Sequence, residues 1–286
     1  FHRMIQTIDG LLPDTDYEIM LVRANEASET VTFHTEPEPI TLNVRDFGAF
    51  GDGVHDDTSA IQAAILCCPK NARVLISKGT YLVTALFLKS DMILELQENA
   101  VLAGIYDRAR PPILPGQIEY DNEDGYYNLG SWEGNPIDSF ASMITGIHVK
   151  NVTICGKGVL DGRADFENWW SRPKDKIRAW RPRMIFLNHC ENITVVGVTV
   201  QNSPAWNLHP YFSNQIRFLD MEVKGPANSH NTDGCDPESC TNVEIAGVHF
   251  SVGDDCIAIK SGKIYMGKKF KVPSKHIHIR QSWMQD

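Results

Sequence analysis

The sequence lacks several features that would assign it to particular classes of protein. No apolar run approaches the ~20 residues that a membrane-spanning helix requires, so we expect no membrane partner. No Cys-x-x-Cys pair occurs, which disfavours a structural zinc site. The formal net charge is −9, and we expect no nucleic-acid partner. The remaining composition, 42% hydrophobic and 22% charged, is that of an ordinary globular chain.

The seven cysteines cannot all pair within one chain, because their number is odd. We expect unpaired cysteines that pack as small core residues. One disulfide between Cys235 and Cys240 is the alternative.

A short phrase, in which a polar turn residue precedes alternating β-branched residues, recurs along the chain. Its copies are anchored on Val152, Ile193, Ile216, Val243 and Ile277, with steps of 41, 23, 27 and 34 residues. Repetition at this period is typical of a solenoid. Val, Ile, Thr and Phe at period two favour strands over helices. The sequence therefore predicts an all-β protein, a parallel β-helix with coils of roughly 22 to 27 residues and two longer insertions.

Two copies of this phrase start with formal glycosylation acceptors, Asn151-Val-Thr and Asn192-Ile-Thr. Both asparagines occupy the same repeat position. We therefore expect turn residues in preference to glycan carriers.

The chain divides into two regions. Residues 1–37 resemble the last strands of a fibronectin type III module, through a Leu-x-Pro-x-Thr-x-Tyr phrase that ends at Tyr17. A proline-rich link precedes the β-helix domain, which we place at residues 40–286. There we expect Asp57 or a neighbour to cap a short helix that covers the first coil. Residues 105–145 are predicted to be a long insertion.

Two acidic clusters near the end of the chain are separated by about one coil. They are Asn231-Thr232-Asp233-Gly234 and Gly253-Asp254-Asp255. Equivalent strands of stacked coils lie about 4.7–4.9 Å apart, so Asp233, Asp254 and Asp255 are predicted to share one patch. Neighbouring residues of a strand face opposite ways, so Gly253 would have to open a bulge or turn. The alternative is that these aspartates only form solenoid turns.

A carboxylate patch of this kind suits sugar cleavage. Glycoside hydrolysis usually needs one protonated carboxyl group for the leaving oxygen and one carboxylate that activates water or attacks directly. Crowded carboxylates cannot all ionise easily, so the pKa of one of them rises.

From Asn43 onward the chain resembles the polygalacturonases of glycoside hydrolase family 28. The resemblance rests on Asp46-Phe-Gly-Ala-x-Gly-Asp-Gly-x-x-Asp-Asp57, on Ser203-Pro-Ala-Trp-Asn-Leu-His-Pro210, on Asn231-Thr-Asp-Gly-Cys-Asp236 and on Gly253-Asp-Asp-Cys-Ile-Ala-Ile-Lys-Ser-Gly262. It implies a right-handed, pectate-lyase-like β-helix that hydrolyses α-1,4-galacturonosidic bonds with inversion and without a cofactor or metal. Asp254 would be the general acid, and Asp233 and Asp255 would position and deprotonate water. The fibronectin-like region and the long insertions look more like the exo-acting bacterial members.

Six residues are candidates for substrate binding. Asn231 and Asp236 belong to the signature, and Lys260 would be the cation beside the acids. His209 lies one coil before Asp233 and could line the cleft, or could be an ordinary coil-edge histidine. Arg181 and Arg183 share an insertion with Trp169, Trp170 and Trp180. The arginines could meet a sugar carboxylate, with an aromatic face stacked on the sugar ring. These tryptophans could equally pack their own insertion onto the solenoid.

Three other functions stay open. They are hydrolysis of rhamnogalacturonan or xylogalacturonan, a calcium-dependent lyase, and a non-catalytic carbohydrate-binding solenoid. The family's Gly-His-Gly and Arg-Ile-Lys phrases, which help to hold substrate, do not occur in the chain. We therefore expect a fragment of a longer enzyme that is weak or inactive alone. For the full-length protein we expect a monomer that acts on polygalacturonate or oligogalacturonides, secreted or periplasmic, or cytoplasmic if the oligomers are imported.

Overall fold

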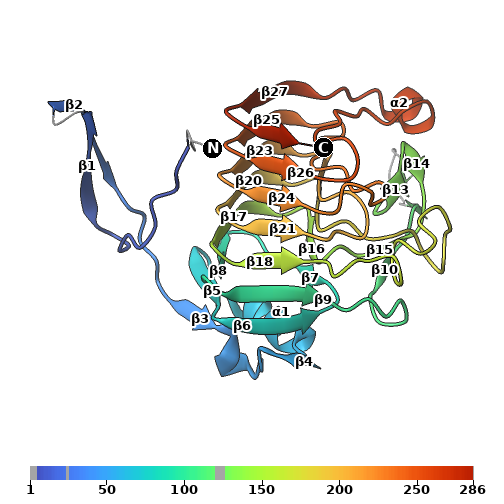
Figure 1. Cartoon of the computed structure of the whole chain (residues 1–286), viewed down its shortest axis with the longest axis horizontal. Coiled ribbons are helices and arrows are strands. Elements are labelled where there is room, and N and C mark those ends of the chain that lie inside the picture. Colours follow the sequence, from blue (N-terminus) through green and yellow to red (C-terminus); the bar gives the residue numbers. More distant parts are fainter. Residues whose placement is uncertain (1–4, 24–25, 120–125, 286) are drawn as a thin grey trace.

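The computed structural model describes residues 5–23, 26–119 and 126–285. Most of them form a right-handed parallel β-helix, which confirms the predicted fold. Its coils stack from the helix α1 (Thr58–Cys67) at one end to the strand β27 (Lys275–Arg280) at the other (Figure 1). Within the described ranges, no helix has both the length and the apolar character needed to cross a bilayer.

Three parallel sheets form the faces of the β-helix. The first contains β3 (Thr41–Asn43), β5 (Ala72–Ile76), β8 (Met92–Leu96), β17 (Lys150–Gly156), β20 (Glu191–Val196), β23 (Asn214–Leu219), β25 (Thr241–Ala246) and β27. The second contains β4 (Asp52–Asp56), β6 (Gly79–Val83), β9 (Ala100–Gly104), β18 (Val159–Asp161), β21 (Thr199–Gln201), β24 (Glu222–Lys224), β26 (His249–Ser251) and β28 (Trp283–Gln285). The third contains β7 (Leu86–Phe87), β16 (Ile144–Ile147), β19 (Ile185–Asn188) and β22 (Leu208–Tyr211).

The register of the first sheet follows the sequence repeat. Each of the five predicted anchors pairs with the next across parallel strands, so the steps of 41, 23, 27 and 34 residues are confirmed as whole coils. The first four anchor side chains are at most 1% exposed. They fill the interior of the solenoid, and burying each one contributes roughly 1.5–3 kcal/mol to stability.

The asparagines of the repeat stack at the turns. Asn151 and Asn192 both adopt a left-handed backbone with φ of 54°, which asparagine tolerates better than most residues. The Nδ2 atom of Asn192 donates to Oδ1 of Asn151 at 2.9 Å, and Asn242 donates to Asn214 at 3.0 Å. This geometry is that of the expected turn residues.

The cysteines are unpaired, as predicted, and the alternative disulfide does not form. Cys235 and Cys240 are both fully buried, with free thiols. Cys68 and Cys190 are buried as well, whereas Cys67 is exposed. Most of the cysteines therefore act as small packing residues.

The first region contains one antiparallel hairpin, β1 (Asp16–Arg23) and β2 (Glu26–His34), which stands away from the coils in Figure 1. Two strands do not define a sandwich, so the fibronectin-like assignment stays a prediction. The segment before the hairpin contacts the solenoid, where Thr7 donates to Asp220 through its amide at 2.8 Å and its hydroxyl at 2.7 Å.

The first coil is covered by α1 and a short 3-10 helix, Val44–Phe47. Asp57 occupies the N-cap position of α1, but its carboxylate accepts the amide protons of Phe50 and Gly51 at 2.6 and 3.0 Å. The neighbouring Asp56 accepts the amide proton of Thr58 at 2.9 Å. Asp57 thus holds the loop before α1 in place, and Asp56 accepts the hydrogen bond from the first residue of α1.

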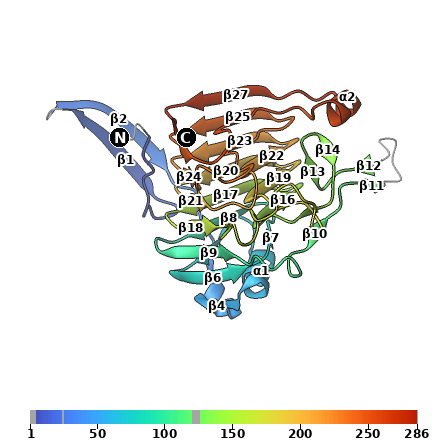
Figure 2. The same ribbon diagram turned by 45° about the vertical axis from the view of Figure 1, so that its right-hand side comes forward.

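The predicted insertion at residues 105–145 is folded into small hairpins, although residues 120–125 lie outside the described ranges. Its strands are β10 (Ile113–Leu114) with β15 (Ser139–Phe140), β11 (Ile118–Glu119) with β12 (Tyr126–Tyr127), and β13 (Ser131–Trp132) with β14 (Asn135–Pro136). The last hairpin lies on the same side of the coils as the helix α2 (Tyr265–Phe270) (Figures 1 and 2). Leu114 and Leu129 of the insertion pack with Phe186 and Tyr211 of the third sheet, so the insertion covers the outer face of that sheet.

Candidate active site

The three predicted acids meet where the third sheet is continued by single bridges. Leu208 pairs with Cys235, which in turn pairs with Ile257. This stacking places Asp233 beside Asp254 and Asp255. One carboxylate oxygen from each of the three lies within 4.8 Å of one from each of the others. Asp233 is buried, whereas the other two are exposed to solvent. The sequence-based prediction of one acidic patch is therefore confirmed in geometry.

The acids could also surround one cation, since carboxylate oxygens are suitable Ca²⁺ ligands. Ca²⁺ usually takes 6–8 oxygen ligands, however, and this group offers three. Exposed carboxylates also gather without an ion. We assign no metal to this site.

Gly253 allows Asp254 and Asp255 to face the same way. The chain leaves β26 at Ser251 and does not pair again until Ile257, so the two acids lie in a turn instead of a strand. A Cβ atom at Gly253 would lie 2.4 Å from the carbonyl oxygen of Ser229. The glycine is thus required by close approach of the backbone and not by a left-handed conformation.

Thr232 holds this turn and was not singled out from the sequence. Its hydroxyl accepts the amide proton of Gly253 at 3.2 Å and lies 2.6 Å from the hydroxyl of Ser229. Thr232 is itself buried. It therefore joins the two acidic clusters through a polar contact independent of the carboxylates.

Lys260 lies beside the acids, as predicted. Its Nζ atom is 3.5 Å from Asp233 Oδ2 and 2.9 Å from Asp236 Oδ1, and it lies 4.5 Å from the centre of a Trp206 ring. Burial raises the pKa of Asp233, an effect that Lys260 opposes and Asp254 reinforces. Lys260 thus forms ion pairs with both Asp233 and Asp236, in a site that is largely shielded from water.

Two predicted substrate contacts are wrong. Asp236 and His209 are both 0% exposed and cannot touch a ligand in the cleft. The His209 Nε2 atom lies 3.0 Å from Oε2 of Glu238, and burial lowers the pKa of His209 to about 4. The rings of Phe186, Trp206 and Tyr211 surround His209, with centres 5.0 to 5.6 Å from that of its imidazole. Trp132 of the insertion stacks on Trp206, with the ring centres 4.3 Å apart.

The two arginines are buried too, so their predicted contact with a sugar carboxylate is wrong. Arg181 donates to the carbonyl oxygens of Pro204 and His230 at 2.6 and 2.9 Å, and to Oδ1 of Asn231 at 2.9 Å. Arg183 donates to the carbonyl oxygen of Ser131 in the insertion. Both arginines tie loops together, and Arg181 also orients Asn231.

The tryptophans follow the packing alternative. Trp169 and Trp170 are buried in a small cluster with Phe140, Ala164 and Ala179. Trp180 is half-buried, with its ring centre 4.9 Å from that of Trp132. The cluster packs the segment of residues 164–179 against Phe140 of the insertion at residues 105–145.

The acids line a cleft of about 440 Å³. Its other lining residues are Glu133, Gly134, Trp206, Asn231, Glu238, Ile259, Lys260, Ser261 and Lys263. Asn231 and Lys260 were expected there, whereas Trp206, Glu238, Glu133 and Lys263 were missed. The spacing could have identified Glu238, because it stands one coil before Lys260 and bridges to it. Glu133 could not be found in this way, since it comes from the insertion.

One wall of the cleft is made by the hairpin β13–β14. Glu133 in its turn forms an ion pair with Lys263 at 2.5 Å, and the amide of Met266 donates to the carbonyl oxygen of Gly134 at 3.2 Å. A Cβ atom at Gly134 would lie 2.2 Å from the carbonyl oxygen of Gly262. The hairpin is therefore packed closely against the loop before α2.

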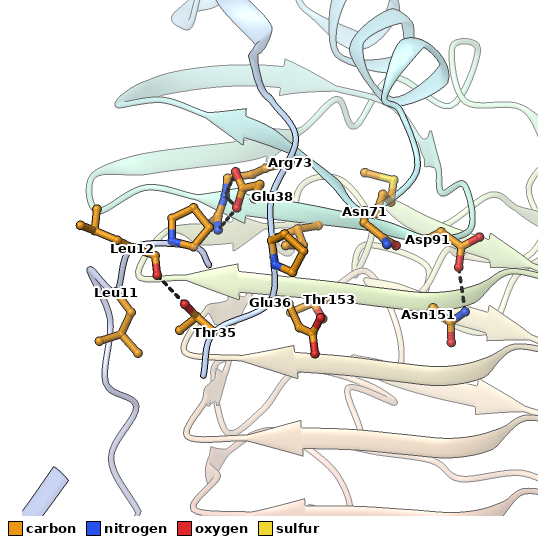
Figure 3. Close-up of a pocket in the computed structure, with 14 residues that line it drawn as sticks. Leu11, Leu12, Thr35, Glu36, Glu38, Asn71, Arg73, Asp91, Asn151 and Thr153 are labelled. Atoms are coloured by element: carbon orange, nitrogen blue, oxygen red, sulfur yellow. Dashed lines mark hydrogen bonds and ion pairs between the residues drawn. The ribbon is translucent and has the colours of Figure 1, made fainter. Parts of the chain in front are cut away.

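A second groove, of about 490 Å³, lies between the proline-rich link and the first sheet (Figure 3). Its lining includes an ion pair between Arg73 and Glu38 and a hydrogen bond from Asn151 to Asp91. None of the three acids reaches it. The chemistry of the acidic patch is therefore confined to the first cleft.

Two family profiles match the chain. The sequence profile "Glycosyl hydrolases family 28" matches residues 125–274, which include every predicted site residue. The profile "Rhamnogalacturonase A/epimerase, pectate lyase-like" matches residues 41–180.

Individual relatives point to the same family. A "Probable polygalacturonase" of Vitis vinifera is 32% identical over 243 residues, which cover 82% of this chain and 47% of that protein. The "Exo-poly-alpha-D-galacturonosidase" of Dickeya chrysanthemi is 28% identical, covering 91% of this chain and 50% of that protein. A crystal structure of an exopolygalacturonase from Thermotoga maritima matches with a TM-score of 0.74 at 27% identity, covering 86% of this chain and 60% of that one. The chain spans about half the length of the curated relatives it matches. With the family profile matching more than half of its residues, the chain belongs to glycosyl hydrolase family 28.

Proposed function

We propose that the protein hydrolyses α-1,4-galacturonosidic bonds of polygalacturonate from a chain end, with inversion at the anomeric carbon. The observation that carries the proposal is the acidic patch itself. Asp233, Asp254 and Asp255 share one cleft with Lys260, a cation suited to an anionic sugar. The names of the relatives support a galacturonan as the substrate.

In this reaction Asp254 protonates the leaving oxygen while water attacks the anomeric carbon. Asp254 suits the role because it is exposed at the cleft, where a glycosidic oxygen can reach it. Asp233 and Asp255 hold the attacking water, and Asp233 accepts its proton. The raised pKa of Asp233 makes it the stronger base once it is ionised.

Inversion rests on family membership and not on the spacing of the acids. Carboxyl groups about 6.5–9.5 Å apart are typical of inverting enzymes, and a separation of about 5–5.5 Å of retaining ones. One oxygen from each acid here lies within 4.8 Å of one from each of the others, which is a distance between oxygens and not between whole carboxyl groups. NMR of the first product tests this point directly, because the anomeric proton shows whether the configuration has changed.

Exo-action is supported by the wall that β13–β14 places beside the acids. The ion pair between Glu133 and Lys263 fastens this wall across the cleft. A polymer that needs to extend past that side would meet the hairpin. A variant in which a short turn replaces residues 131–136 should therefore release longer products. The protein with the intact hairpin should release monomers or dimers.

The site of action is part of the proposal. Polygalacturonate is a polymer, so we propose that the enzyme works outside the cytoplasm, with imported oligogalacturonides as the cytoplasmic alternative. Activity measured in separated culture medium, periplasm and cytoplasm would distinguish these locations.

The test is reducing-sugar release and product length from polygalacturonate with the full-length protein. Asp254→Asn should abolish release, whereas Asp46→Asn, an exposed aspartate at the far end of the solenoid, should not. Rhamnogalacturonan and xylogalacturonan belong in the same experiment, because the second profile match names a rhamnogalacturonase. Release only from one of these would overturn the substrate. Binding without release from any substrate would overturn the enzyme assignment.

A further inference from the structure

A second carboxyl group lies beneath the proposed base and takes no part in the proposed reaction. Asp236 is 0% exposed, and its Oδ1 atom lies 2.9 Å from Lys260 Nζ. The same Nζ atom lies 3.5 Å from Asp233 Oδ2. Both Asp236 carboxyl oxygens are buried and, among the described residues, have no partner besides the ion pair with Lys260. A hydrogen bond between the two carboxyl groups that share Lys260 would require that one of them carry a proton.

The surrounding charges do not supply a second cation for this pair. Around Asp236 the charged and titratable groups are Asp233, Lys260, Arg183 and Cys235. Arg183 is also buried, and its strongest attraction is to Glu238. With Arg183 balanced in this way, Lys260 remains as the partner of two carboxyl groups.

The charged groups around Asp233 likewise provide one close cation. They are Lys260, Arg181, Asp236 and the two exposed acids Asp254 and Asp255. Asp233 is the weakest of the influences on the pKa of Arg181, whose guanidinium donates to two carbonyl oxygens and to Asn231. Lys260 is therefore the close cation of Asp233 as well.

The proton belongs on the more deeply buried member of the pair. An ionised carboxyl group loses more solvation where it is better shielded from water. Asp236 is fully shielded, whereas the Asp233 side chain is 6% exposed and opens on the cleft. Burial raises the pKa of both groups and leaves that of Asp236 well above its usual value.

We propose that Asp236 is a positioning residue that carries the proton of this carboxyl pair, donates it as a hydrogen bond to Asp233, and leaves Asp233 ionised beside Lys260. The inference rests on the proposed function. During hydrolysis water gives its oxygen to the anomeric carbon and its proton to Asp233, the glycosidic bond breaks, and Asp254 protonates the leaving oxygen. The proton on Asp236 stays in place, so Asp236 is not itself a catalytic residue.

The first test needs no turnover. The protein is labelled with ¹³C in the aspartate side-chain carboxyl groups, and NMR spectra are recorded from about pH 5 to 8. The signals that disappear in Asp236→Asn and Asp233→Asn identify the two residues in the wild type. We expect the Asp236 signal at the protonated position throughout, and the Asp233 signal at the ionised position near pH 7. An ionised Asp236 at pH 7 would overturn the inference.

The second test uses the activity of the full-length protein. Asparagine imitates a protonated aspartate, so Asp236→Asn should keep kcat/KM within about threefold and leave the acidic limb of its pH profile in place. Asp236→Ala removes the hydrogen bond to a charged group, so kcat/KM should fall about tenfold or more and the acidic limb should move to higher pH.

A merely structural role would not separate these two variants by their pH profiles when both retain the wild-type Tm. An acidic limb that moves about one pH unit down in Asp236→Asn would show that Asp236 is ionised, and would refute the proposal. A wild-type protein without turnover would refute the proposed function, while the NMR titration would still decide where the proton lies.

Discussion

The backbone amide of Gly234 donates a hydrogen bond to the carbonyl oxygen of Asp255 at 2.9 Å. The next amide along, that of Cys235, donates to the carbonyl oxygen of Cys256 at 3.0 Å. These two bonds fix the distance between Asp233 and the second acidic cluster through the main chain. The geometry of the proposed catalytic acids is therefore set by the stacking of coils and depends little on flexible side chains.

Substituting Gly253 should disturb this geometry. The new Cβ atom of Gly253→Ala would lie 2.4 Å from the carbonyl oxygen of Ser229 and 2.7 Å from that of Pro226, and neither can move without the backbone. Overpacking of this kind costs about 1–3 kcal/mol. We expect a lower Tm and a loss of kcat of tenfold or more, because a small displacement of reacting groups is expensive.

Gly225→Ala is the matched control for that variant. Its Cβ atom would meet only the Ser229 hydroxyl, at 3.7 Å. Its stability should stay within about 0.5 kcal/mol of the wild type. Equal losses in both variants would show that the Gly253 contact is not special.

Replacing Lys260 should shift the pH profile of kcat/KM. Lys260 lowers the pKa of Asp233, so its removal in Lys260→Met should raise that pKa. The base would then stay protonated to a higher pH, and the acidic limb should move upward. Lys268→Met, which changes an exposed lysine of α2, is the control. An unchanged acidic limb in Lys260→Met would argue against Asp233 as the base.

His209 should make the fold sensitive to acid. Burial lowers its pKa to about 4, whereas in the unfolded chain it is about 6.5. Between these values the unfolded chain binds a proton that the native protein does not. The free energy of unfolding should therefore fall as the pH decreases from 6.5 towards 4, by up to about 1.4 kcal/mol per pH unit.

Urea midpoints at a series of pH values measure this effect. Half-buried His189, whose pKa is also lowered to about 4 by loss of solvation, should add a similar slope. His209→Gln should reduce the acid-side slope, and exposed His276→Gln should leave it unchanged. An identical slope in wild type and His209→Gln would contradict the prediction.

Added salt should raise KM for polygalacturonate more than KM for a short oligogalacturonide. Residues 256–285 contain seven of the 27 lysines and arginines and none of the 36 acidic residues, although the whole chain is acidic. Several of these cations stand on or near α2, beside the wall of the cleft. An anionic polymer attracted by them should bind less tightly as salt screens the charges.

Reversing Lys268 and Lys269 to glutamate should raise KM for polygalacturonate several-fold with little change in kcat, because neither residue lines the cleft. Lys70→Glu with Lys78→Glu makes the same change in net charge among the first coils and should leave KM unaffected. Equal effects of the two double variants would indicate a response to overall charge alone.

The successes and failures of sequence analysis follow from what each inference depends on. The coil register was predictable because the turn asparagines and the alternating Val and Ile residues are local signals repeated in every coil. The acidic patch followed from the same register. His209, Asp236, Arg181 and Arg183 were assigned to the substrate wrongly, because burial depends on segments that lie elsewhere in the sequence.

The β-helix, the pairing of its coils and the meeting of Asp233 with Asp254 and Asp255 are encoded locally, since the repeat spacing sets which residues stack. Which polar groups face the cleft depends instead on contacts between distant parts of the chain. The insertion folds back over the third sheet, so it buries Arg183, packs Trp132 on the Trp206 ring beside His209, and brings Glu133 to the wall of the cleft. The hydrogen bond of Arg183 and the ion pair of Glu133 join residues 52 and 130 positions apart, and no local pattern encodes them.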